Sequence, residues 1–301
     1  MTASPLTGKS ILVTGVTGMV AGPVAAKLAA AGNTVYGAAR FKDPAQREAH
    51  EAAGVQTVRV DLETRDFAEV PDGLDYVLNF AVARTNDFAT DMAANGEGSA
   101  ALMERCQDVV AFFQCSSAAV YQPNGHEVLA EDAPLGDSHR AAGMESYSIS
   151  KIVSEALVMH TAARLGVPTV IARLSVPYGD HFGWPFFHKM MIEHGMNIDV
   201  HPDAPSQFSP LHLDDIVGSI PFLLDAAGVP ATVVNWGGDE VVSVEEWCDL
   251  IGEMIDKPIN YVHSEATIPS IIVDLTKLHD LGFHSSVSWR DGIANMVEAN
   301  R

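Results

Sequence analysis

A short apolar strand, a glycine turn and a helix stand near the start of the chain and set its fold class. Residues Ser10–Thr14 form a β-branched apolar run that ends at Gly15, and an alanine-rich helical stretch covers Pro23–Ala31. Gly15 allows a tight turn, and Gly18 lets the backbone approach a pyrophosphate at the positive end of the helix. Strand, glycine turn and helix in this order predict a dinucleotide-binding unit.

The same alternation of strand and helix continues along the chain. Further strands are predicted at Thr34–Ala39, Val55–Val60, Asp75–Phe80, Val109–Gln114 and Val167–Arg173. Helices are predicted over Asp87–Cys106 and from Tyr147 to Gly166. This spacing implies right-handed crossovers and an α/β fold with a doubly wound parallel sheet of the Rossmann type. Ligands of such sheets bind at the carboxyl ends of the strands.

Beyond Arg173 the composition changes, and a second, smaller lobe is expected. Residues 177–210 are rich in proline, glycine, histidine and aromatics. The elements predicted after Arg173 are helices at Phe187–His194, Leu213–Ala226, Val244–Ile255, Leu275–Leu281 and from Trp289 onward, and a strand at Thr232–Asn235. We expect a dinucleotide-binding domain of residues 1–174 plus about 211–236. Residues 175–210 and 237–301 would form a C-terminal substrate lobe that closes a cleft over the strand ends.

The charge of the chain narrows the class of partner. Lysine and arginine total 18 against 39 acidic residues, a net charge of −21, which argues against nucleic acid or an anionic membrane. Three cysteines without metal-like spacing fit a reducing cytoplasm, and Cys115 is expected in the core. We see no signal peptide or membrane span, and we predict a cytoplasmic protein. The 12 histidines show no ligand pattern, so no metal site is predicted.

Tyr147 and Lys151 are candidate catalytic residues, because residues four apart on a helix share one face. A free tyrosine has a pKa near 10, and an ammonium about 4 Å away favours the phenolate by about 4 kcal/mol. A phenol so placed can exchange protons at neutral pH, and the Ser117 hydroxyl could hold a substrate oxygen. Tyrosine and lysine at this spacing are common on helix surfaces, so the spacing alone does not indicate a site. The assignment is supported by other candidate residues that are predicted at the carboxyl ends of the strands, where ligands bind: Gly15, Arg40, Asp61, Ala81, Ser117 and Pro177.

Two basic residues bear on the cofactor. Arg40 and Lys42 follow the second predicted strand, and the first acid after it is Asp43. An acid at that strand end accepts the ribose hydroxyls of NAD, whereas a base meets the 2′-phosphate of NADP. We therefore expect NADP(H) to be favoured, with NAD(H) possible. The alternative is that both bases are solvated surface residues.

These features together resemble the extended short-chain dehydrogenase/reductase family, also called the NAD-dependent epimerase/dehydratase family. Its glycine motif resembles Thr14–Gly22, except that Ala21 stands at the third glycine position and Gly22 follows one residue late. The other similar segments are Asp61-Leu62, Asn79–Ala81 with Arg84, Asn95, Cys115–Tyr121, Tyr147 with Lys151, Arg173–Gly179 and His212–Asp215. In the region of the cofactor, Arg40–Pro44 is similar to the dihydroflavonol reductase-like carbonyl reductases.

The resemblance implies a role for each site residue. Tyr147 would be the acid/base, Lys151 would hold the nicotinamide ribose, and Ser117 would bind the reacting oxygen. Asn95 would be the helix asparagine associated with the lysine. The expected cofactor contacts are Gly15, Thr17, Gly18, Met19, Val20, Arg40, Lys42, Asp61, Leu62, Phe80, Ala81, Val82, Arg84, Tyr147, Lys151 and Pro177. The resemblance also implies a homodimer that pairs the helices at Asp87–Cys106 and Tyr147–Gly166.

The expected substrate contacts are Ser117, Ala118, Val176, Trp184 and Phe208. A nucleotide-sugar diphosphate needs cationic side chains, yet residues 174–301 hold only Lys189, Lys257, Lys277, Arg290 and Arg301. In nucleotide-sugar members the resemblance places asparagine at position 176 and arginine at 208. Trp184, Phe186, Phe187 and Phe208 would suit an uncharged, partly apolar substrate, although we expect at least half of them to be core.

These departures predict an NADP(H)-dependent oxidoreductase that reduces a carbonyl, or oxidises the alcohol, of a small molecule without a nucleotide. The alternative is a nucleotide-sugar 4-epimerase with tightly bound NAD. Dehydration is disfavoured, because Ala118 and Ala119 stand where the family's dehydratases carry an acidic pair. A non-catalytic, cofactor-sensing regulator is disfavoured too, because Ser117, Tyr147 and Lys151 are all present.

Overall fold

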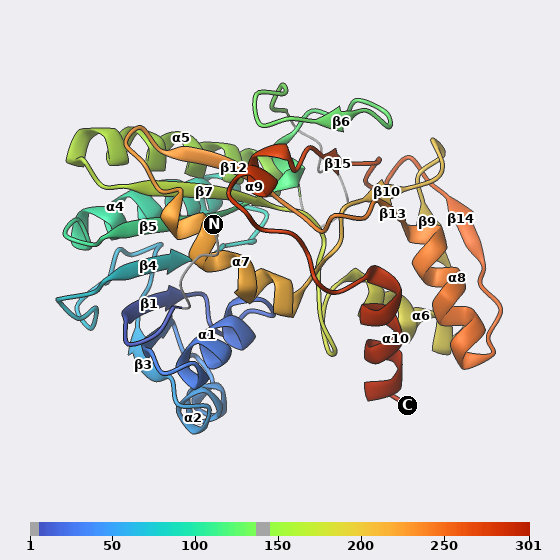
Figure 1. Ribbon diagram of the computed structural model, residues 1–301, viewed down its shortest axis with the longest axis horizontal. Helices are drawn as coiled ribbons and strands as arrows, with labels where there is room; N and C mark the ends of the chain where they lie inside the picture. The colour runs from blue at the N-terminus through green and yellow to red at the C-terminus, as the bar shows by residue number, and fades with distance from the viewer. Residues whose placement is uncertain (1–5, 137–144) are drawn as a thin grey trace. The chain divides into compact units, whose positions relative to one another are not determined.

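The computed structural model describes residues 6–136 and 145–301. It contains a seven-stranded sheet whose strands come from residues 10–236. Its strands are β1 (Ser10–Thr14), β2 (Thr34–Ala39), β3 (Gln56–Arg59), β4 (Tyr76–Asn79), β5 (Ala111–Ser117), β7 (Thr169–Leu174) and β12 (Thr232–Trp236). They lie in the order β12-β7-β5-β4-β1-β2-β3, and β1 pairs in parallel with both β2 and β4 (Figure 1). The predicted doubly wound Rossmann sheet is confirmed.

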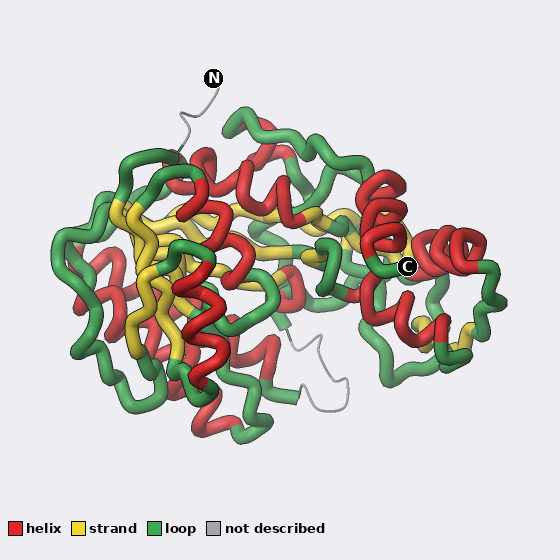
Figure 2. Tube along the Cα trace, turned by 90° about the horizontal axis from the view of Figure 1, so that it is seen from below, coloured by secondary structure: helices red, strands yellow, loops and turns green. Residues whose placement is uncertain are grey.

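Helices lie on both sides of these strands, as Figure 2 shows. They include α1 (Ala21–Ala30), α2 (Pro44–Ala52), α4 (Gly98–Arg105), α5 (Tyr147–Leu165) and α7 (Leu213–Asp225). The strand β1 is apolar throughout its centre, and Ile11, Leu12 and Val13 are fully buried. The helix α5 ends at Gly166, whose φ of +73° is a left-handed conformation that glycine adopts without strain.

The helix predicted over Asp87–Cys106 is interrupted. It consists of α3 (Phe88–Met92), a π-helical turn at Ala93–Glu97, and α4. Periodicity cannot reveal a single wide turn, because the apolar spacing on either side remains helical. Such turns are frequent at functional sites, and this one carries Asn95.

The chain divides into two compact units. Unit 1 holds Met1–Ser117, Ser146–Arg173 and Val217–Val234, and unit 2 holds Ala118–Glu145, Leu174–Ile216 and Asn235–Arg301. The division differs from the expected domains chiefly because the segment after β5 groups with the C-terminal part of the chain. The reason is pairing of β6 (Val128–Leu129) with β15 (Ile272–Val273), which no local pattern in the sequence indicates.

Unit 2 is built from short elements. Besides β6 and β15 they are a 3-10 turn (Ala118–Val120), β8 (Pro177–Tyr178), α6 (Trp184–Glu193), β9 (Ile198–Val200), β10 (Gln207–Phe208), β11 (Leu211–His212), β13 (Val242–Ser243), α8 (Val244–Ile255), β14 (Tyr261–His263), α9 (Thr276–Asp280) and α10 (Trp289–Ala299). The helix α8 begins at a capping box, in which Ser243 and Glu246 bond each other's backbone N–H groups.

Of the four aromatics that would suit an apolar substrate, one is fully in the core of unit 2. Phe208 is 2% exposed, and its ring lies 5.1 Å from that of Trp184 and 6.4 Å from that of Trp247. Trp184 and Phe186 are partly buried, and Phe187 is 41% exposed. The expectation that at least half would be core residues was therefore too high.

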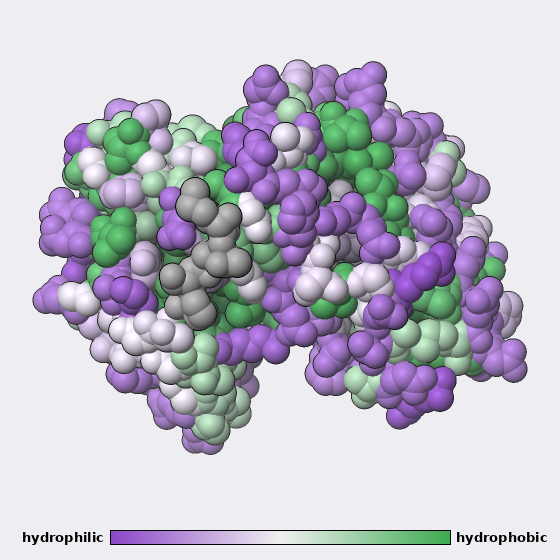
Figure 3. Space-filling model, viewed as in Figure 1, coloured by the Kyte–Doolittle hydropathy of each residue, from purple (hydrophilic) through white to green (hydrophobic). Residues whose placement is uncertain are grey.

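The surface shows small hydrophilic and hydrophobic patches side by side on the face drawn in Figure 3. Among the described residues, no helix combines the length and the apolar character needed to span a membrane. The three cysteines are free and buried, which confirms Cys115 as a core residue. Burial raises the pKa of the Cys115 thiol, against the opposing influence of the Lys151 charge.

A buried ion pair joins α5 to β7 inside unit 1. The guanidinium of Arg173 makes two hydrogen bonds to the Glu155 carboxylate, at 3.0 and 2.7 Å, and both side chains are 3% exposed. The hydroxyl of Ser116 donates to the same carboxylate. A bidentate pair with a third donor satisfies the charges that burial would otherwise penalise.

We predict that Glu155→Gln destabilises the protein by about 3–5 kcal/mol, because it leaves the Arg173 charge buried without a counter-charge. Glu104→Gln is the control, because its exposed partner Arg164 lies on the same helix α5, and its loss should cost at most about 1 kcal/mol. Urea unfolding measures both. Equal losses in the two variants would show that burial adds nothing to this pair.

Candidate active site

The glycine turn after β1 is closely packed. Gly15 has a φ of +74°, and a Cβ atom there would lie 2.8 Å from the Cα of Ala81. The N–H of Gly15 donates to Ala38 O at 2.8 Å, and the N–H of Gly18 donates to Gly15 O at 2.8 Å. Only glycine fits at position 15, and the turn lies against the backbone that follows β4.

The third glycine role belongs to Gly22. A Cβ atom there would lie 2.6 Å from Val16 O, so the one-residue offset from the family motif preserves the close approach of helix and turn. At the start of α1, Val20 makes no side-chain cap, and none of the described first-turn residues is acidic. Thr17 and Met19 are exposed beside it. A helix start without a side-chain cap or an acidic residue, next to an exposed turn, fits a dinucleotide pyrophosphate.

The end of β2 presents bases rather than an acid. Arg40 and Lys42 are exposed, and the carboxylate of Asp43 accepts the N–H of Ala45 at 3.0 Å, which caps α2. Arg47 adds a third base, with its guanidinium 5.6 Å from the ring centre of Phe41. Sequence analysis did not single out Arg47, which comes from the next helix.

His50 is a further residue that the sequence did not indicate. Its ring lies 6.3 Å from that of Phe41, and its Cε1 would be 3.1 Å from a Cβ atom on Gly22. Burial lowers the pKa of His50, and a hydrogen bond with the backbone of Val16 acts in the opposite direction. The helix α2 is thereby attached to the glycine turn.

The predicted adenine pair follows β3. Leu62 is buried, and its carbonyl oxygen would lie 2.4 Å from a Cβ atom on Gly98 in α4. Asp61 is partly exposed and accepts the N–H of Glu63 at 3.1 Å. Gly98 therefore allows α4 to approach this segment.

A buried polar network supports the segment that follows β4. The hydroxyl of Thr14 accepts the N–H of Ala81 at 3.1 Å and donates to Asn79. The Asn79 amide in turn donates to Ser99 at 2.9 Å and to Gln114 at 2.8 Å. These bonds join β1, β4 and β5 below Phe80 and the residues after it, including Val82 and the exposed Arg84.

Asn95 holds the same segment from the other side. Its carbonyl oxygen accepts the N–H of Ala83 at 2.6 Å, and its amide donates to Ala83 O at 2.9 Å and to Ser150 at 3.0 Å. The ammonium of Lys151 instead donates to Cys115 O at 2.9 Å. The resemblance associates Asn95 with the lysine, but among the described residues its side chain bonds Ala83 and Ser150. Asn95 is therefore placed to position the loop after β4.

Asp91 is a positioning residue that the sequence analysis missed. It is fully buried, accepts Thr85 N–H at 2.9 Å and Asn86 N–H at 3.2 Å, and accepts the hydroxyl of Ser146. Ser146 directly precedes Tyr147. Asp91 thus joins the loop after β4 to the start of α5.

The predicted catalytic residues lie on two adjacent elements. Ser117 is the last residue of β5, and Tyr147 is the first of α5. Lys151 is one helical turn further on, 3% exposed, and bonded to the carbonyl two residues before Ser117. The strand and the helix are held together at the end that carries all three side chains.

The residues predicted to contact substrate beyond Ser117 belong to unit 2. Ala118 is buried. Pro177, which was predicted to contact the cofactor, also belongs to unit 2 and pairs with Leu211 between β8 and β11. Val176 has a φ of +23°, a conformation that β-branched residues rarely adopt. A valine side chain therefore stands at a position whose backbone favours glycine or asparagine.

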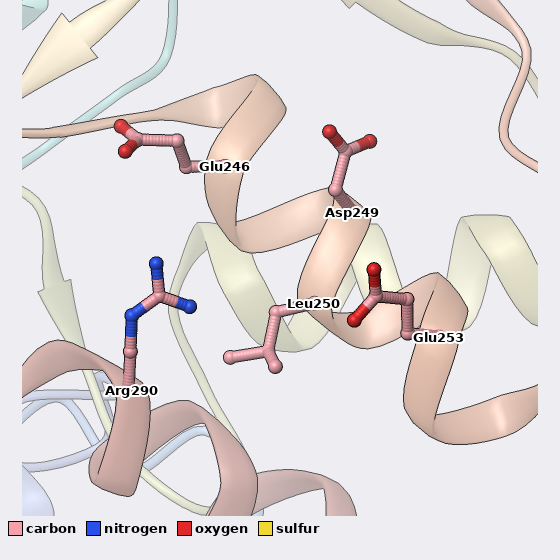
Figure 4. A pocket seen from close by; sticks show the side chains of 5 residues that line it. All are labelled: Glu246, Asp249, Leu250, Glu253 and Arg290. Carbon is pink, nitrogen blue, oxygen red and sulfur yellow. The ribbon is translucent and has the colours of Figure 1, made fainter.

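A separate pocket of about 210 Å³ lies between α8 and α10 in unit 2 (Figure 4). It is lined by Glu246, Asp249, Leu250, Glu253 and Arg290. The lining includes three carboxylates and one guanidinium, and none of the predicted site residues contributes. It does not resemble an anion site.

Comparison with known proteins agrees with this geometry. A family model described as the NAD dependent epimerase/dehydratase family matches residues 11–237. Among curated relatives, dTDP-D-glucose 4,6-dehydratase of Mus musculus is 24% identical over 80% of this chain and 67% of its own length. The same enzyme of Homo sapiens is 23% identical over 81% and 69%.

Two solved structures show the same fold. MoeE5 in complex with UDP-glucuronic acid and NAD has a TM-score of 0.81 at 20% identity, covering 97% of this chain and 98% of that one. UDP-N-acetylglucosamine 4-epimerase of Methanobrevibacter ruminantium M1 has a TM-score of 0.82 at 16% identity, covering 98% of both. At 20% and 16% identity, these similarities show that the chain has the fold of the two proteins.

A Rossmann sheet with serine, tyrosine and lysine at one strand end defines a dinucleotide-dependent enzyme of the short-chain dehydrogenase/reductase type. The chain belongs to the NAD dependent epimerase/dehydratase family.

We predict that Asp91→Asn removes a pH-dependent part of the stability. Burial alone would raise the pKa of Asp91, but hydrogen bonds from Ser146, Thr85 and Asn86 together lower it. A carboxylate with a lowered pKa stabilises the fold above its unfolded pKa of about 3.9, and this contribution is lost as pH falls through the folded value.

Urea unfolding of both proteins at a series of pH values measures the effect. The stability difference between wild type and Asp91→Asn should be constant near neutral pH and shrink below about pH 4. A difference that does not change with pH would contradict the assignment. Asp108→Asn, at an exposed position beyond α4, is the control and should leave the profile unchanged.

Proposed function

We propose that this chain is an NADP(H)-dependent oxidoreductase that interconverts a carbonyl and an alcohol on a small molecule without a nucleotide diphosphate. The observation that carries the proposal is that most described lysine and arginine side chains of unit 2 already contact an acid or an aromatic ring. Few of them could bind a diphosphate. The end of β2, in contrast, presents exposed basic residues that could bind the 2′-phosphate of NADP.

The chemistry requires one proton and one hydride. Bound nicotinamide would supply or take the hydride at the reacting carbon. In reduction, the phenol of Tyr147 gives its proton to the carbonyl oxygen while the hydroxyl of Ser117 donates a hydrogen bond to that oxygen. The ammonium of Lys151, fixed at Cys115 O, stabilises the negative charge left on the phenol. In oxidation the same groups act in reverse.

The described cations of unit 2 are largely engaged. Lys189 is buried, pairs with Glu193 and donates to Asn300 O at 2.9 Å. Lys277 pairs with Glu131, Arg290 lies over Trp289 and Arg301 pairs with Glu298. Lys257 is exposed after α8, and Arg140 lies outside the described residues. This supports a substrate that needs no cationic partner from unit 2.

Preference for NADP(H) is supported by the end of β2. Arg40 and Lys42 are exposed there, and the nearby acid Asp43 is used in capping α2. A 2′-phosphate would gain charge-assisted hydrogen bonds from these bases, whereas the ribose hydroxyls of NAD would gain no acidic acceptor at the strand end.

A second candidate is a nucleotide-sugar 4-epimerase that retains NAD. It is favoured by the relatives, since MoeE5 was solved with UDP-glucuronic acid and NAD. Bound NAD would take a hydride from the sugar carbon and return it, while the same three side chains would move the proton and hold the oxygen. In that case no net cofactor is consumed.

One experiment separates the two functions. The protein is assayed with NADPH against a panel of ketones and aldehydes, and separately with UDP-sugars whose C4 configuration is followed by NMR. Net loss of NADPH absorbance with a carbonyl compound supports the proposal. Interconversion of UDP-sugars by protein carrying tightly held NAD would overturn it in favour of the epimerase.

We predict that Tyr147→Phe lowers turnover by about 10²–10⁴-fold, the usual contribution of a positioned general acid, and leaves cofactor affinity nearly unchanged. Turnover is measured with the best substrate of the panel, and affinity by cofactor fluorescence. Tyr76→Phe, on β4 and partly exposed, is the control and should keep full activity. Activity retained in Tyr147→Phe would refute the role.

We predict that Arg40→Ala weakens NADPH binding by about 10–100-fold, the equivalent of one charge-assisted hydrogen bond, and leaves NADH binding unchanged. Fluorescence titration with both cofactors measures this. Arg65→Ala is the control, because Arg65 is exposed and pairs with Glu97. Equal affinity of the wild type for the two cofactors would contradict the phosphate role.

A further inference from the structure

Three metal-ligating side chains from separate segments of unit 2 meet at one place. They are Asp239 in the turn after β12, His279 in α9 and His284 between α9 and α10. His279 Nε2 lies 3.2 Å from one oxygen of Asp239, and His284 Nδ1 lies 3.3 Å from the other. The two imidazole rings stack with centroids 4.3 Å apart. Three potential ligand atoms therefore converge within 4.8 Å of one another.

The ligand atoms are close enough together for one ion to bind them after the side chains turn. Zinc binds imidazole nitrogen and carboxylate oxygen at about 2.0–2.1 Å, so two of its ligands lie about 3.3–3.4 Å apart. Each imidazole nitrogen lies near this distance from Asp239, but the two nitrogens face different oxygens of the carboxylate, as in imidazole–carboxylate hydrogen bonds. Because the rings are stacked and their lone pairs lie in the ring planes, binding one ion requires the two rings to turn toward the same point.

The cluster is held in place by its surroundings. Ser285 donates its N–H to Asp239 at 3.3 Å, and its hydroxyl accepts the N–H of Asp239 at 3.0 Å. Gly282, with a φ of +93°, forms the turn between the two histidines and donates to His279 O at 2.8 Å. Such second-shell bonds orient a ligating carboxylate before a metal arrives.

The charge around the cluster is negative. Asp215 accepts Ser286 N–H at 2.9 Å and Val287 N–H at 3.1 Å, and Glu240 accepts Trp289 N–H at 2.8 Å. Residues 174–301 contain 19 acidic side chains and five lysines or arginines. This field attracts cations to the segment that carries the histidines.

We propose that Asp239, His279 and His284 bind one Zn²⁺ ion, with water in the fourth position. Two imidazoles and a carboxylate are ligands of intermediate softness that zinc accepts. The ion joins the turn after β12 to the segment between α9 and α10, and its role is structural. It lies within unit 2 and does not depend on the proposed hydride chemistry.

The site modifies the expectation that the chain holds no metal. The two histidines are five positions apart, within the spacing seen in zinc sites, but the third ligand is 40 positions earlier in the chain. Only the fold brings it to them.

The test uses tag-free, full-length protein that has been treated with a chelator and exchanged into metal-free buffer. Zn²⁺ is titrated by calorimetry, and Co²⁺ by visible absorption. We expect one saturable site per chain and the intense bands of four-coordinate Co²⁺. His284→Gln and Asp239→Asn should each weaken Zn²⁺ binding by at least about tenfold.

His194→Gln is the matched control, because His194 is an exposed histidine at the end of α6, and it should bind Zn²⁺ as the wild type does. Thermal unfolding without metal shows whether each variant is folded. Hydrogen exchange over residues 279–289 should slow when Zn²⁺ is added. Absence of saturable binding, or equal affinities in wild type, His284→Gln and Asp239→Asn, would overturn the proposal.

Discussion

The bond from the ammonium of Lys151 to the carbonyl of Cys115 fixes the geometry on which the candidate active site depends. A buried ammonium must be hydrogen-bonded, and this one is satisfied by a backbone atom of β5 rather than by a mobile side chain. The helix α5 is therefore aligned along the strand that ends in Ser117. One turn further on, the pair of Glu155 with Arg173 holds the same helix against β7.

The loop after β4 is held by hydrogen bonds from three different elements. Thr14 supports it from β1, Asn95 from the π-helical turn, and Asp91 from α3. Asn95 also donates to Ser150, in the first turn of α5, and Asp91 also accepts the hydroxyl of Ser146, which directly precedes Tyr147. The segment predicted to lie under the cofactor and the segment that carries the acid/base are thus parts of one hydrogen-bonded assembly.

The sequence predicted the parts of this site that are local. The strand at Ser10–Thr14, the helix at Val244–Ile255 and the glycine turn were read directly from apolar spacing and glycine positions. The π-helical turn was missed, because one wide turn does not disturb the apolar pattern. Asp91 was missed because its partners lie six and 55 positions away, and an acid in a helix reads as a solvated residue. The grouping of residues 118–145 with unit 2 depends on pairing with β15, which is also non-local.

The distribution of charge connects the two proposals. The bases that could bind a phosphate stand at the end of β2, while the last 128 residues of the chain are strongly acidic. Such a lobe repels a diphosphate unless cations are placed to receive it, and its described lysines and arginines are mostly paired with acids or stacked on an aromatic ring. The same excess of carboxylates favours a divalent cation beside His279 and His284. The proposed uncharged substrate and the proposed zinc ion would therefore both follow from one charge pattern.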